Sequence, residues 1–387
     1  MRRHLSAHSA LASRASAKQA RTEVPVVFGT GLVALDIILS AYPNRPPILA
    51  AGGTCGNVLA VLSFWGWDAF PIARLNGDVA SETVTQDLER WGVDLEFARQ
   101  TPSAPTPIIL QRNGRTRDGK PRHRFSVACP ACGAWYPSFR AVTIQGAESV
   151  IEAVSDALHS GFAPRVFFFD RVSRGSLLLA HWFGDHGALV VFEPIGAGDP
   201  KLFSEALSLA HIVKYSEERL HESSVAPPRK NRLLLEIQTL AEAGLRYRFA
   251  RESQKTWRRL TAIPSAVLMD TAGAGDWLTA AFLRMVGAAG ALGFTTLSQP
   301  DVRDALRLGQ AVASVACEYE GARGAMAALD RAKLDRRVAS LLRGESTAAS
   351  RPENLQLDSV GARATRLPDS ETASPLELNT ICPTCPC

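Results

Sequence analysis

Short apolar runs alternate with helical patterns along most of the chain. VPVVFGTGLVALDII (24–38) opens as a strand, and NVLAVLSFWG (57–66) has a helical pattern. DAFPIARLNGD (68–78) returns as a strand and turn, and SETVTQDLERWGVD (81–94) is an amphipathic helix with a glycine stop. Four nearly continuous apolar runs come later, namely RVFFFD (165–170), ALVVFEP (188–194), HIVKYS (211–216) and RLLLEI (232–237). Such runs between helices predict an α/β fold with a parallel sheet covered on both faces.

A turn rich in glycine and alanine stands near the end of this pattern. Residues 268–282 read LMDTAGAGDWLTAAF. VLMD (267–270) has the pattern of the end of a buried strand, and WLTAAFLRMV (277–286) repeats apolar residues at helical spacing. The small residues between them therefore stand at a predicted helix N-terminus, where free backbone N–H groups and the helix dipole favour an anion.

Asp276 lies on the first turn of that predicted helix. A carboxylate beside an anion site suits a group that takes up a proton during the reaction, as the base of a phosphoryl transfer does. The alternative interpretation is a turn without further function in which Asp276 caps the helix.

The composition is typical of a soluble globular protein and narrows the possible partners. The chain has 387 residues, of which 46% are hydrophobic and 21% are charged. No run approaches the roughly 18–20 apolar residues of a membrane-spanning helix. The net charge of +5 is modest, and no basic stripe is evident. We therefore expect a cytoplasmic protein, a monomer or homodimer, that acts on a small molecule and not on nucleic acid or membranes.

Both ends have the composition of unstructured tails. Residues 1–23 hold five Lys or Arg and no acidic residue before Glu23, which resembles a transit peptide; a disordered tail and a misassigned start codon are the alternatives. From Gly344 the chain is polar and rich in Pro, Ser and Thr, so it buries too little apolar surface to offset the entropy of ordering. We expect one folded domain over 24–343 between disordered tails at 1–23 and 344–387.

Several motifs, in a consistent order, resemble those of the ribokinase/PfkB family of carbohydrate kinases. DTAGAGD (270–276) matches the family's C-terminal D-T-x-G-A-G-D motif throughout, and AGGTCGNVLAVLSFWG (51–66) resembles its N-terminal Gly-Gly motif. Asp36, at the end of the first predicted strand, and the turn LNGD (75–78) match two further family positions. The resemblance covers roughly residues 24–340. It implies a ribokinase-like three-layer α/β/α sandwich with a mostly parallel central sheet and a small β lid.

The resemblance implies an ATP-dependent kinase that uses Mg²⁺ and assigns roles to matching residues. Asp276 would be the general base. The anion hole for the transferring phosphoryl group would be formed by Gly273, Ala274 and Gly275. Substrate hydroxyls would be held by Asp36, Gly52, Gly53 and Asn57. A strand-end cap is the structural alternative for Asp36.

The third of the late apolar runs and the turn after it resemble the family's nucleotide region less closely. HIVKYSEERL (211–220) is similar to the K-x-S-x-x-E segment of fructokinase-like members, which implies nucleotide contacts by Lys214 and Ser216. The family's metal-linked glutamate falls on Arg219. We expect either that Glu218 replaces it through a shifted turn or that the handling of Mg²⁺ is altered.

The next strand and turn depart from the family in one glycine. LLLEIQTLAEAGLRYRF (233–249) resembles the T-x-G-x-x-G turn that supports ATP, with Thr239 and Gly244 in place. The first glycine is replaced by Ala241, which is tolerated if its φ is negative. Thr271, in DTAGAGD, is also expected to contact the nucleotide.

TPIILQRNGRTRDGKPRHRFSVACPACGAWYPSFR (106–140) lies where the family places lid strands over the sugar. IILQ and HRFSV, joined by NGRTRDGK, predict a β-hairpin, and we expect lid elements at about 37–50 and 104–140. Basic residues crowd the hairpin, namely Arg115, Arg117, Lys120, Arg122, His123 and Arg124. A basic lid suits an already phosphorylated substrate; ordinary solvated hairpin charges are the alternative.

Two cysteine motifs remain. CPACG (129–133) has the shape of a zinc knuckle, and ICPTCPC (381–387) ends the chain. One interpretation is a zinc site built from Cys129, Cys132, Cys382 and Cys385. A redox pair at either end, or a structural turn with incidental tail cysteines, are the alternatives. Seven cysteines in 387 residues do not indicate a secreted disulfide scaffold.

The function that these features favour is an ATP-dependent kinase for the hydroxymethyl group of a sugar or sugar-like metabolite. A nucleoside kinase is the alternative within the same fold. A non-catalytic relative that binds a sugar or nucleotide is the alternative from another class. Asp276 and the intact Gly-Ala-Gly turn favour the kinase, whereas Arg219 and Ala241 favour the non-catalytic relative.

Overall fold

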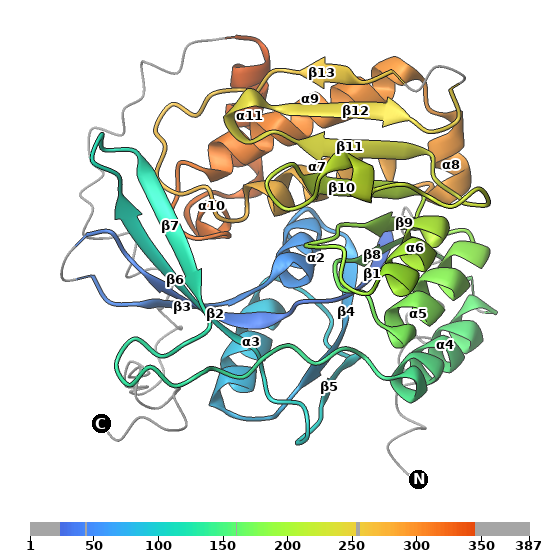
Figure 1. Cartoon of the computed structure of the whole chain (residues 1–387), viewed down its shortest axis with the longest axis horizontal. Coiled ribbons are helices and arrows are strands. Elements are labelled where there is room, and N and C mark those ends of the chain that lie inside the picture. The colour runs from blue at the N-terminus through green and yellow to red at the C-terminus, as the bar shows by residue number, and fades with distance from the viewer. Residues whose placement is uncertain (1–23, 43–44, 160, 253–255, 345–387) are drawn as a thin grey trace.

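A nine-stranded sheet runs through the centre of the protein (Figure 1). The computed structural model describes residues 24–344 apart from 43–44, 160 and 253–255, so residues 1–23 and 345–387 of the two predicted tails lie outside it. The strand order is β13 (Arg258–Leu260), β12 (Leu245–Phe249), β11 (Leu235–Thr239), β10 (Ile212–Ser216), β9 (Leu189–Phe192), β8 (Pro164–Phe169), β1 (Val26–Thr30), β4 (Asp68–Leu75), β5 (Ala98–Gln100). Neighbours from β11 to β5 pair in parallel, and only β12 and β13 add antiparallel pairs, which confirms the mostly parallel sheet.

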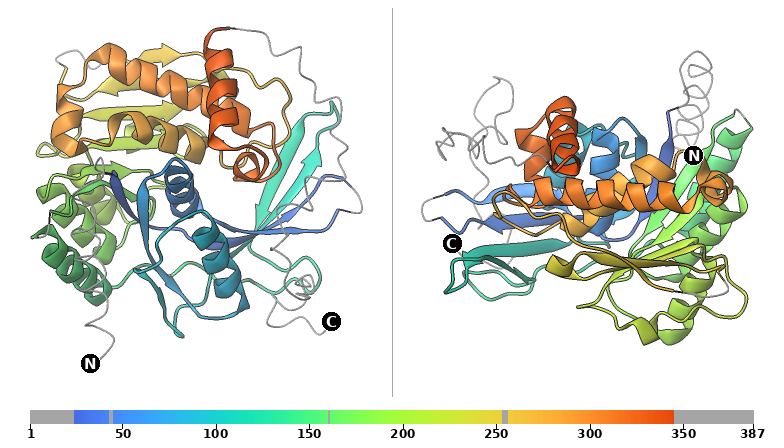
Figure 2. Two further views of the ribbon diagram at one scale, coloured as in Figure 1. Left: turned by 180° about the vertical axis from the view of Figure 1, so that it is seen from behind. Right: turned by 90° about the horizontal axis from the view of Figure 1, so that it is seen from above.

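Helices cover both faces of this sheet (Figure 2). One face carries α2 (Thr54–Phe64), α3 (Val79–Arg90), α7 (Ala274–Val286), α8 (Gly290–Thr296), α9 (Gln299–Ala316) and α11 (Arg331–Leu342), with the short α10 (Gly324–Ala328) after α9. The other face carries α4 (Ile144–Leu158), α5 (Arg174–Asp185) and α6 (Pro200–Leu209). Alternating β1 side chains enter the two cores, Val27 on the first face and Val26 and Phe28 on the second. The predicted three-layer sandwich is confirmed.

A second sheet of four strands stands beside the first, at the left of Figure 1. Its order is β3 (Ile48–Gly52), β2 (Ala34–Leu39), β6 (Ile108–Arg115) and β7 (Pro121–Ser126). Strands β6 and β7 are antiparallel partners, from Leu110 opposite Ser126 to Arg115 opposite Pro121, which confirms the predicted hairpin. This four-stranded sheet is called the lid below.

Two expectations about strands are wrong. Asp36 does not end the first strand but lies inside β2. Strand β1 ends at Thr30, and the chain then crosses from the main sheet to the second, four-stranded sheet. VLMD is not a strand. Val267 and Leu268 are 53% and 40% exposed, and the N–H groups of Met269 and Asp270 both donate to the Cys317 carbonyl at the end of α9, at 2.8 and 3.2 Å. Apolar composition alone did not distinguish a paired strand from a segment docked on a helix end.

Within the described ranges, no single helix is long and apolar enough to cross a membrane. Helices α7 and α8 meet a length and composition criterion only when taken together, and they are bent by 80° at their junction. Most residues of α7 are buried inside the protein, which is the ordinary state of a core helix.

Candidate active site

Helix α7 begins at the glycine-rich turn, as the sequence predicted. Gly273 precedes it in the left-handed conformation, with a φ of 76°. A Cβ at this position would lie 2.6 Å from the Cβ of Ala322, so both the conformation and the space require glycine. The Ala274 N–H is used within the turn, where it donates to the Thr271 carbonyl at 3.3 Å.

The first turn of α7 begins with backbone N–H groups that precede the first hydrogen bond of the helix. The first intrahelical hydrogen bond runs from the Trp277 N–H to the Gly273 carbonyl at 2.9 Å. The N–H groups of Gly275 and Asp276 precede that bond and stand at the helix end, where an anion is favoured. The structure therefore supplies the local geometry of an anion site, and its use as an anion hole stays a prediction.

Asp276 is a buried carboxylate on this first turn, 9% exposed. Asn57 Nδ2, from α2, donates to its Oδ2 at 2.7 Å. Burial raises the pKa of Asp276 to about 7, and the nearby carboxylates of Glu193 and Asp170 also act to raise it. The Asn57 hydrogen bond and the charge of Lys214 act in the opposite direction. A carboxyl group with a pKa near 7 can take up and release a proton near neutral pH.

Glu193 lies next to this turn and was not selected from the sequence. It directly follows β9, forms an ion pair with Lys214 of β10, and accepts a hydrogen bond from Thr279 Oγ1 at 2.8 Å. Lys214 Nζ lies 3.4 Å from the place that a Cβ on Gly275 would take. A sequence signal for Glu193 did exist, since it is an acidic residue directly after a buried apolar strand. The carboxyl ends of parallel strands meet at the edge of the sheet where ligands bind, so such a residue is a candidate site residue.

Asp170 follows β8 at the same edge and was also not selected. It accepts the Leu32 N–H at 2.9 Å on Oδ1, and Arg171 Nη1 lies 2.6 Å from Oδ2. A Cβ on Gly31 would lie 1.6 Å from Oδ1, so glycine at this position leaves room for the carboxylate to bind the backbone that follows β1. Burial raises the pKa of Asp170 to about 6. Asp170 therefore braces the crossing into the lid and adds negative charge near Asp276.

The residues expected to hold the substrate lie where the lid meets α2. A Cβ on Gly52 would lie 1.9 Å from Asp36 Oδ2. Gly53 precedes α2 with a φ of 81°, and a Cβ there would lie 2.4 Å from the Leu32 carbonyl oxygen. Both glycines are required by the close approach of neighbouring atoms.

Two buried oxygens at this place lack partners. Within the described part of the chain, Asp36 Oδ1 and Asn57 Oδ1 have no hydrogen-bond partner. Buried polar atoms are normally paired, so two orphaned acceptors suit a ligand that donates hydrogen bonds, such as a polyol. Burial raises the pKa of Asp36 to about 7, against the charge of Arg323 and a hydrogen bond from Gly53.

Arg323 is a buried cation that braces the same region. It lies just before α10, and its Nη2 donates to the Ala51 carbonyl and to the carboxylate of Asp87. The Ala51 N–H in turn donates to Asp87 Oδ2 at 2.8 Å. These contacts join β3 to α3 directly before the two glycines, so Arg323 holds the Gly-Gly segment against Asp36.

Asp270, the first residue of DTAGAGD, connects the lid to the start of α7. Its buried carboxylate accepts the Ala272 N–H at 2.9 Å. From β6 of the lid, Gln111 Nε2 donates to it at 2.6 Å and Asn113 Nδ2 at 3.2 Å. Asn113 Nδ2 also donates to Glu320 Oε1 at 3.0 Å. The lid is therefore held against the turn that opens α7 by amide donors on two carboxylates.

We expect Asn113→Asp to weaken substrate binding. The change places a third carboxylate against Asp270 and Glu320 and removes two donated hydrogen bonds, so the lid is repelled from the turn. A hydrogen bond to a charged group contributes about 1.5–3 kcal/mol, so the loss of one of the two is enough for a roughly 10- to 100-fold rise in KM for the accepted substrate. Steady-state kinetics measure this, and Glu320→Gln added to the variant should recover part of the loss. An unchanged KM would show that lid contact does not support binding.

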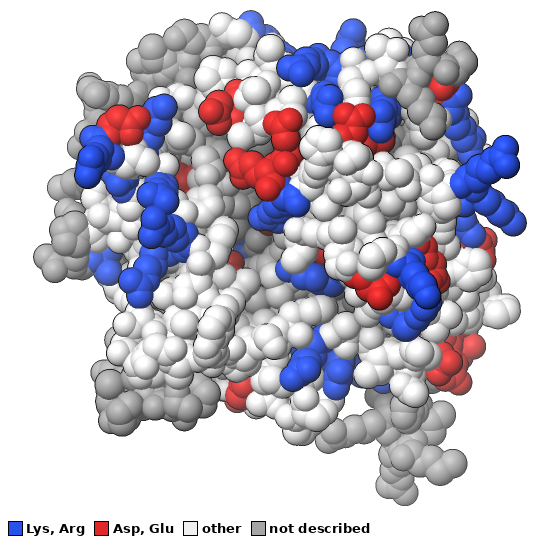
Figure 3. Space-filling model, in the orientation of Figure 1, with Lys and Arg blue, Asp and Glu red and all other residues white. Residues whose placement is uncertain are grey.

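The basic side chains of the lid hairpin lie mostly in solvent, and Figure 3 shows them gathered over β7. Arg115 Nη1 donates to the Gly119 carbonyl at 2.8 Å, and Lys120 Nζ lies 3.7 Å from Asp118 Oδ2. His123 differs, because its Nδ1 lies 3.4 Å from Asp270 Oδ1. Only this one of the six predicted basic residues contacts the DTAGAGD carboxylate.

The residues expected to bind the nucleotide lie at the ends of β10 and β11. Ser216 ends β10, and its Oγ accepts the Glu218 N–H at 3.2 Å, while the Glu218 side chain is exposed. Thr239 ends β11. Gly244 has a φ of 100°, and a Cβ there would lie 2.2 Å from the Leu260 carbonyl oxygen, so glycine is required. The replacement of the family glutamate by Glu218 stays a prediction.

Ala241 departs from its expected conformation. Its φ is +48°, and among the described residues it is the single non-glycine residue with a positive φ. The condition under which alanine would be tolerated, a negative φ, is not met, because the turn η2 (Ala241–Ala243) keeps the backbone that suits a glycine. The left-handed conformation costs a residue with a side chain roughly 1–2 kcal/mol.

We therefore expect Ala241→Gly to stabilise the fold. Relief of the left-handed strain outweighs the roughly 0.4–1 kcal/mol that glycine costs through the entropy of the unfolded chain, so the gain should be up to about 1 kcal/mol. Urea unfolding measures it. Ala243→Gly, in the same turn with a negative φ, is the matched control and should destabilise the fold. Equal effects of the two changes would contradict the assignment of strain to Ala241.

Half of the predicted zinc ligands are described. Cys129 is buried and Cys132 exposed, both as free thiols, whereas Cys382 and Cys385 lie outside the described residues. Backbone N–H groups of Cys132 and Ala131 donate to the Cys129 sulfur and lower the pKa of this thiol to about 6. Over residues 24–344, as far as described, no three His, Cys, Asp or Glu side chains form a metal-binding group. Zinc therefore remains a proposal.

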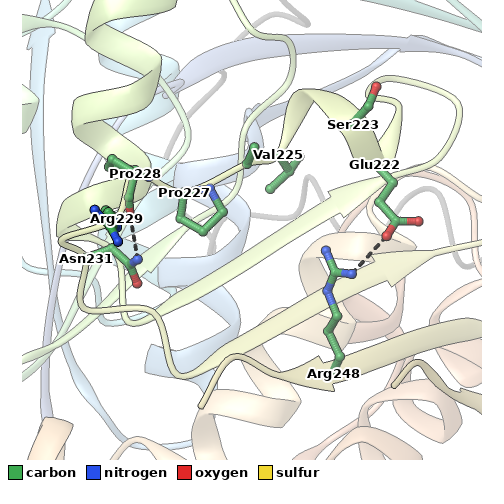
Figure 4. A pocket seen from close by; sticks show the side chains of 9 residues that line it. Glu222, Ser223, Val225, Pro227, Pro228, Arg229, Asn231 and Arg248 are labelled. Atoms are coloured by element: carbon green, nitrogen blue, oxygen red, sulfur yellow. Dashed lines mark hydrogen bonds and ion pairs between the residues drawn. The ribbon is translucent and has the colours of Figure 1, made fainter. Parts of the chain in front are cut away.

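A pocket of about 590 Å³ lies between the loop after β10 and strand β12 (Figure 4). Glu222, at the start of η1 (Glu222–Ser224), pairs there with Arg248, whose Nη1 lies 2.9 Å from Oε1. Arg229 and Asn231 line the opposite wall. None of the lining residues belongs to the cluster around Asp276, so this pocket is separate from the candidate active site.

Three solved structures share this fold. The aminoimidazole riboside kinase of Salmonella enterica, complexed with aminoimidazole riboside and an ATP analogue, is 18% identical with a TM-score of 0.58, and the match covers 81% of this chain and 99% of that one. The fructokinase of Vibrio cholerae O395, bound to fructose, ADP and calcium, is 16% identical with a TM-score of 0.59 and coverage of 81% and 99%. The nucleoside kinase of Burkholderia thailandensis, in complex with inosine, is 16% identical with a TM-score of 0.57 and coverage of 82% and 98%. The fold is therefore ribokinase-like.

The sequence itself carries a family match over its later part. No curated protein sequence matches the chain. Residues 186–328 match the family described as pfkB family carbohydrate kinase. The matched segment contains Glu193, Lys214 and Asp276, which meet at the open end of α7. This later part of the chain thus matches the pfkB family of carbohydrate kinases, which are phosphotransferases, and the whole fold is ribokinase-like.

Proposed function

We propose that this protein transfers the γ-phosphoryl group of ATP to a hydroxymethyl group of a sugar or sugar-like metabolite. The observation that carries the proposal is Asp276, a buried carboxylate bonded to Asn57 at the open end of α7. A carboxylate is favoured by the helix dipole but repels a bound phosphate, and it loses that repulsion when it takes a proton from the attacking hydroxyl. This is the behaviour of a general base.

The proposed reaction uses few protein groups. The substrate oxygen forms a bond to the γ-phosphorus, the bond from that phosphorus to the bridging oxygen of ADP breaks, and Asp276 receives the hydroxyl proton. Backbone donors of the turn made by Gly273, Ala274 and Gly275 would stabilise the charge on the transferring group. Positioning of the two substrates supplies much of the remaining rate.

Substrate binding is assigned to the region where the lid meets α2. The orphaned oxygens of Asp36 and Asn57 would accept hydrogen bonds from substrate hydroxyls. Gly52 and Gly53 would leave the backbone open to close approach. Burial removes water from the carboxyl group of Asp36 and so raises its pKa to about 7. The hydroxyl groups of a polyol would donate the hydrogen bonds that water no longer provides.

The nucleotide would lie over the ends of β10 and β11. Its proposed contacts are Lys214, Ser216, Glu218, Thr239, Gly244 and Thr271. Mg²⁺ bound to nucleotide phosphates needs only one or two protein carboxylates, because waters and phosphates complete its shell. Glu193, beside Gly275, fits that need together with Glu218. When bound, Mg²⁺ would offset part of the negative charge of the phosphates. We also propose a cytoplasmic location, because a kinase of this kind consumes ATP.

A nucleoside kinase is the second candidate. Two of the structures that share the fold hold aminoimidazole riboside and inosine, so the same architecture accommodates nucleosides in those proteins. A non-catalytic sugar- or nucleotide-binding protein is the third candidate. The strained Ala241 in the nucleotide turn favours it, because strain at that place weakens the case for an optimised ATP site.

A substrate panel separates these functions. Free sugars, sugar phosphates and nucleosides are each assayed with Mg-ATP, and ADP release is followed together with mass analysis of the product. We expect turnover with a free or phosphorylated sugar, and only a small residual rate from Asp276→Asn. Turnover with nucleosides alone would favour the second candidate. Calorimetric binding of a sugar or nucleotide without turnover on any compound would exclude a kinase.

A further inference from the structure

Another pocket, of about 260 Å³, lies between strands β4 and β5 and the start of helix α4. Its floor is apolar, because Ile72, Phe97 and Val150 belong to the core under that helix. The helices α2 and α7, which carry Asn57 and Asp276, cover the other face of the sheet. The pocket is therefore separate from the candidate active site.

Two arginines line this pocket side by side. Arg74 of β4 and Arg99 of β5 are register partners in a parallel pair, so their side chains leave the sheet on the same face. That face is the one that carries the floor, since Ile72 and Phe97 each stand two residues earlier in the chain. Two guanidinium groups on neighbouring strands repel each other unless a negative charge lies near both.

No carboxylate of the described residues supplies that negative charge. Of the described residues that line the pocket, none is Asp or Glu. Within the same part of the chain, neither Arg74 nor Arg99 has a carboxylate at ion-pair distance. Arg74 Nη1 donates to a neutral acceptor, the Ala141 carbonyl oxygen, at 3.3 Å. Arg248 of β12, by contrast, pairs with Glu222, so the pocket differs from other arginine sites of this sheet in its uncompensated charge.

Neutral donors complete the lining without adding charge. Thr143 caps α4, and its Oγ1 accepts the Gly146 N–H at 3.0 Å. The hydroxyl of Thr143 keeps its hydrogen for another acceptor, and the side-chain amide of Gln145 offers two more donors. Because the cap already occupies this end of the helix, the attraction for an anion comes from the two arginines and not from the helix dipole.

We propose that this pocket binds a small anion that carries a phosphate group, with Arg74 and Arg99 as its ligands. A guanidinium group presents paired N–H donors in a fork that matches phosphate oxygens, and such charge-assisted hydrogen bonds are stronger than neutral ones. A phosphate group has a charge of about −1.5 to −2 near neutral pH, which balances two arginines. Inorganic phosphate and a small phosphorylated metabolite share this chemistry, and the apolar floor suits the carbon skeleton of the second.

Calorimetric titration of the full-length protein tests the proposal. The probes are inorganic phosphate, glycerol 3-phosphate and succinate, in a buffer without ATP or Mg²⁺ and at constant ionic strength, because salt screens exposed charges. We expect saturable binding of both phosphates and tighter binding of glycerol 3-phosphate, whose carbon atoms can contact the floor. Equal or tighter binding of inorganic phosphate would identify free phosphate as the ligand.

Variants of the arginines locate the bound anion. Arg74→Gln and Arg99→Gln should each weaken phosphate binding by roughly 10- to 100-fold, since each removes hydrogen bonds between charged groups. Arg99→Lys keeps the charge but loses the fork, so its loss should be smaller than that of Arg99→Gln. Arg259→Gln is the matched control and should bind like the unchanged protein, because Arg259 is an exposed arginine on β13, the opposite edge strand of the same sheet.

Arg99 is exposed, so Arg99→Gln keeps the test decisive if Arg74→Gln fails to fold after losing its bond to Ala141. Equal phosphate binding by Arg99→Gln and Arg259→Gln would place the anion elsewhere, for example on the turn before α7, and would overturn the proposal. The absence of saturable binding of either phosphate, or tighter binding of succinate than of both, would also overturn it. Kinase activity is not a readout in any arm, so the result does not depend on the proposed function.

Discussion

Asp276→Asn should remove nearly all turnover and, at neutral pH, make the fold more stable. An amide cannot accept the substrate proton, and loss of a general base typically costs about 10²–10⁴-fold in rate. Substrate binding should survive. In the unchanged protein Asn57 Nδ2 donates to Asp276 Oδ2 at 2.7 Å, and the amide of the variant still offers an oxygen to this donor. A rate close to that of the unchanged protein would exclude Asp276 as the base.

The gain in stability follows from the raised pKa. The folded protein holds the Asp276 proton up to about pH 7, whereas the unfolded chain releases it near pH 3.8. The stability that this group contributes is therefore complete below about pH 4 and is lost as the pH rises through 7. The uncharged amide escapes this loss. A shift of about 3 pKa units corresponds to at most about 4 kcal/mol, at about 1.4 kcal/mol per unit.

Denaturant unfolding at two pH values measures this effect. The variant should exceed the unchanged protein in free energy of unfolding at pH 8, and the difference should shrink toward pH 5. Asp335→Asn is a suitable control, because Asp335 is a half-exposed partner of Arg284 and its removal should change stability by less than about 1 kcal/mol. A gain in stability that does not depend on pH would show that the pKa of Asp276 is not the cause.

Opposite changes to the ion pair beside Asp276 should move the pH dependence of the rate in opposite directions. The acidic limb of kcat/KM reports the pKa of the base in the free enzyme. Glu193 acts to raise the pKa of Asp276 and Lys214 acts to lower it. Glu193→Gln should therefore shift the acidic limb to lower pH, and Lys214→Gln should shift it to higher pH.

Stability adds a second measurement on the same variants. Each single change leaves one buried charge without its partner, which typically costs about 3–5 kcal/mol. The double variant should lose less stability than the sum of the single changes and should return the acidic limb toward its original position. The limb position is independent of any loss in kcat that Glu193→Gln causes through Mg²⁺. Shifts in the same direction for both single variants would contradict the electrostatic assignment.

Features that arise from neighbouring residues could be predicted from the sequence. The start of α7 was predicted because small residues before an apolar helical repeat leave backbone donors open, and Gly273 indeed takes a left-handed conformation. The hairpin β6–β7 was predicted because turn residues separate two alternating segments. The apolar runs that became β8, β9, β10 and β11 were predicted because a strand covered on both faces has to be apolar throughout.

Local patterns failed where a neighbour distant in sequence decides the outcome. VLMD was read as a strand because its residues are apolar, but it bonds to the end of α9. Alanine at position 241 would be tolerated with a negative φ, yet the turn that joins β11 to β12 gives it a φ of +48°. Neither result follows from propensity, since tertiary pairing overrides weak local preferences.

The sequence by itself determined the layers of the fold, the glycine turn, the place of Asp276 and the family motifs, because each depends on residue type at short spacing. Only the tertiary structure decided that Glu193, Asp170 and Lys214 surround Asp276. It also decided that Asp270 receives the amides of the lid. These groups come from separate strands and helices, and their pKa values depend on burial and on charges acting through space. Such effects fall off with distance in the folded molecule and not along the chain, so no sequence pattern contains them.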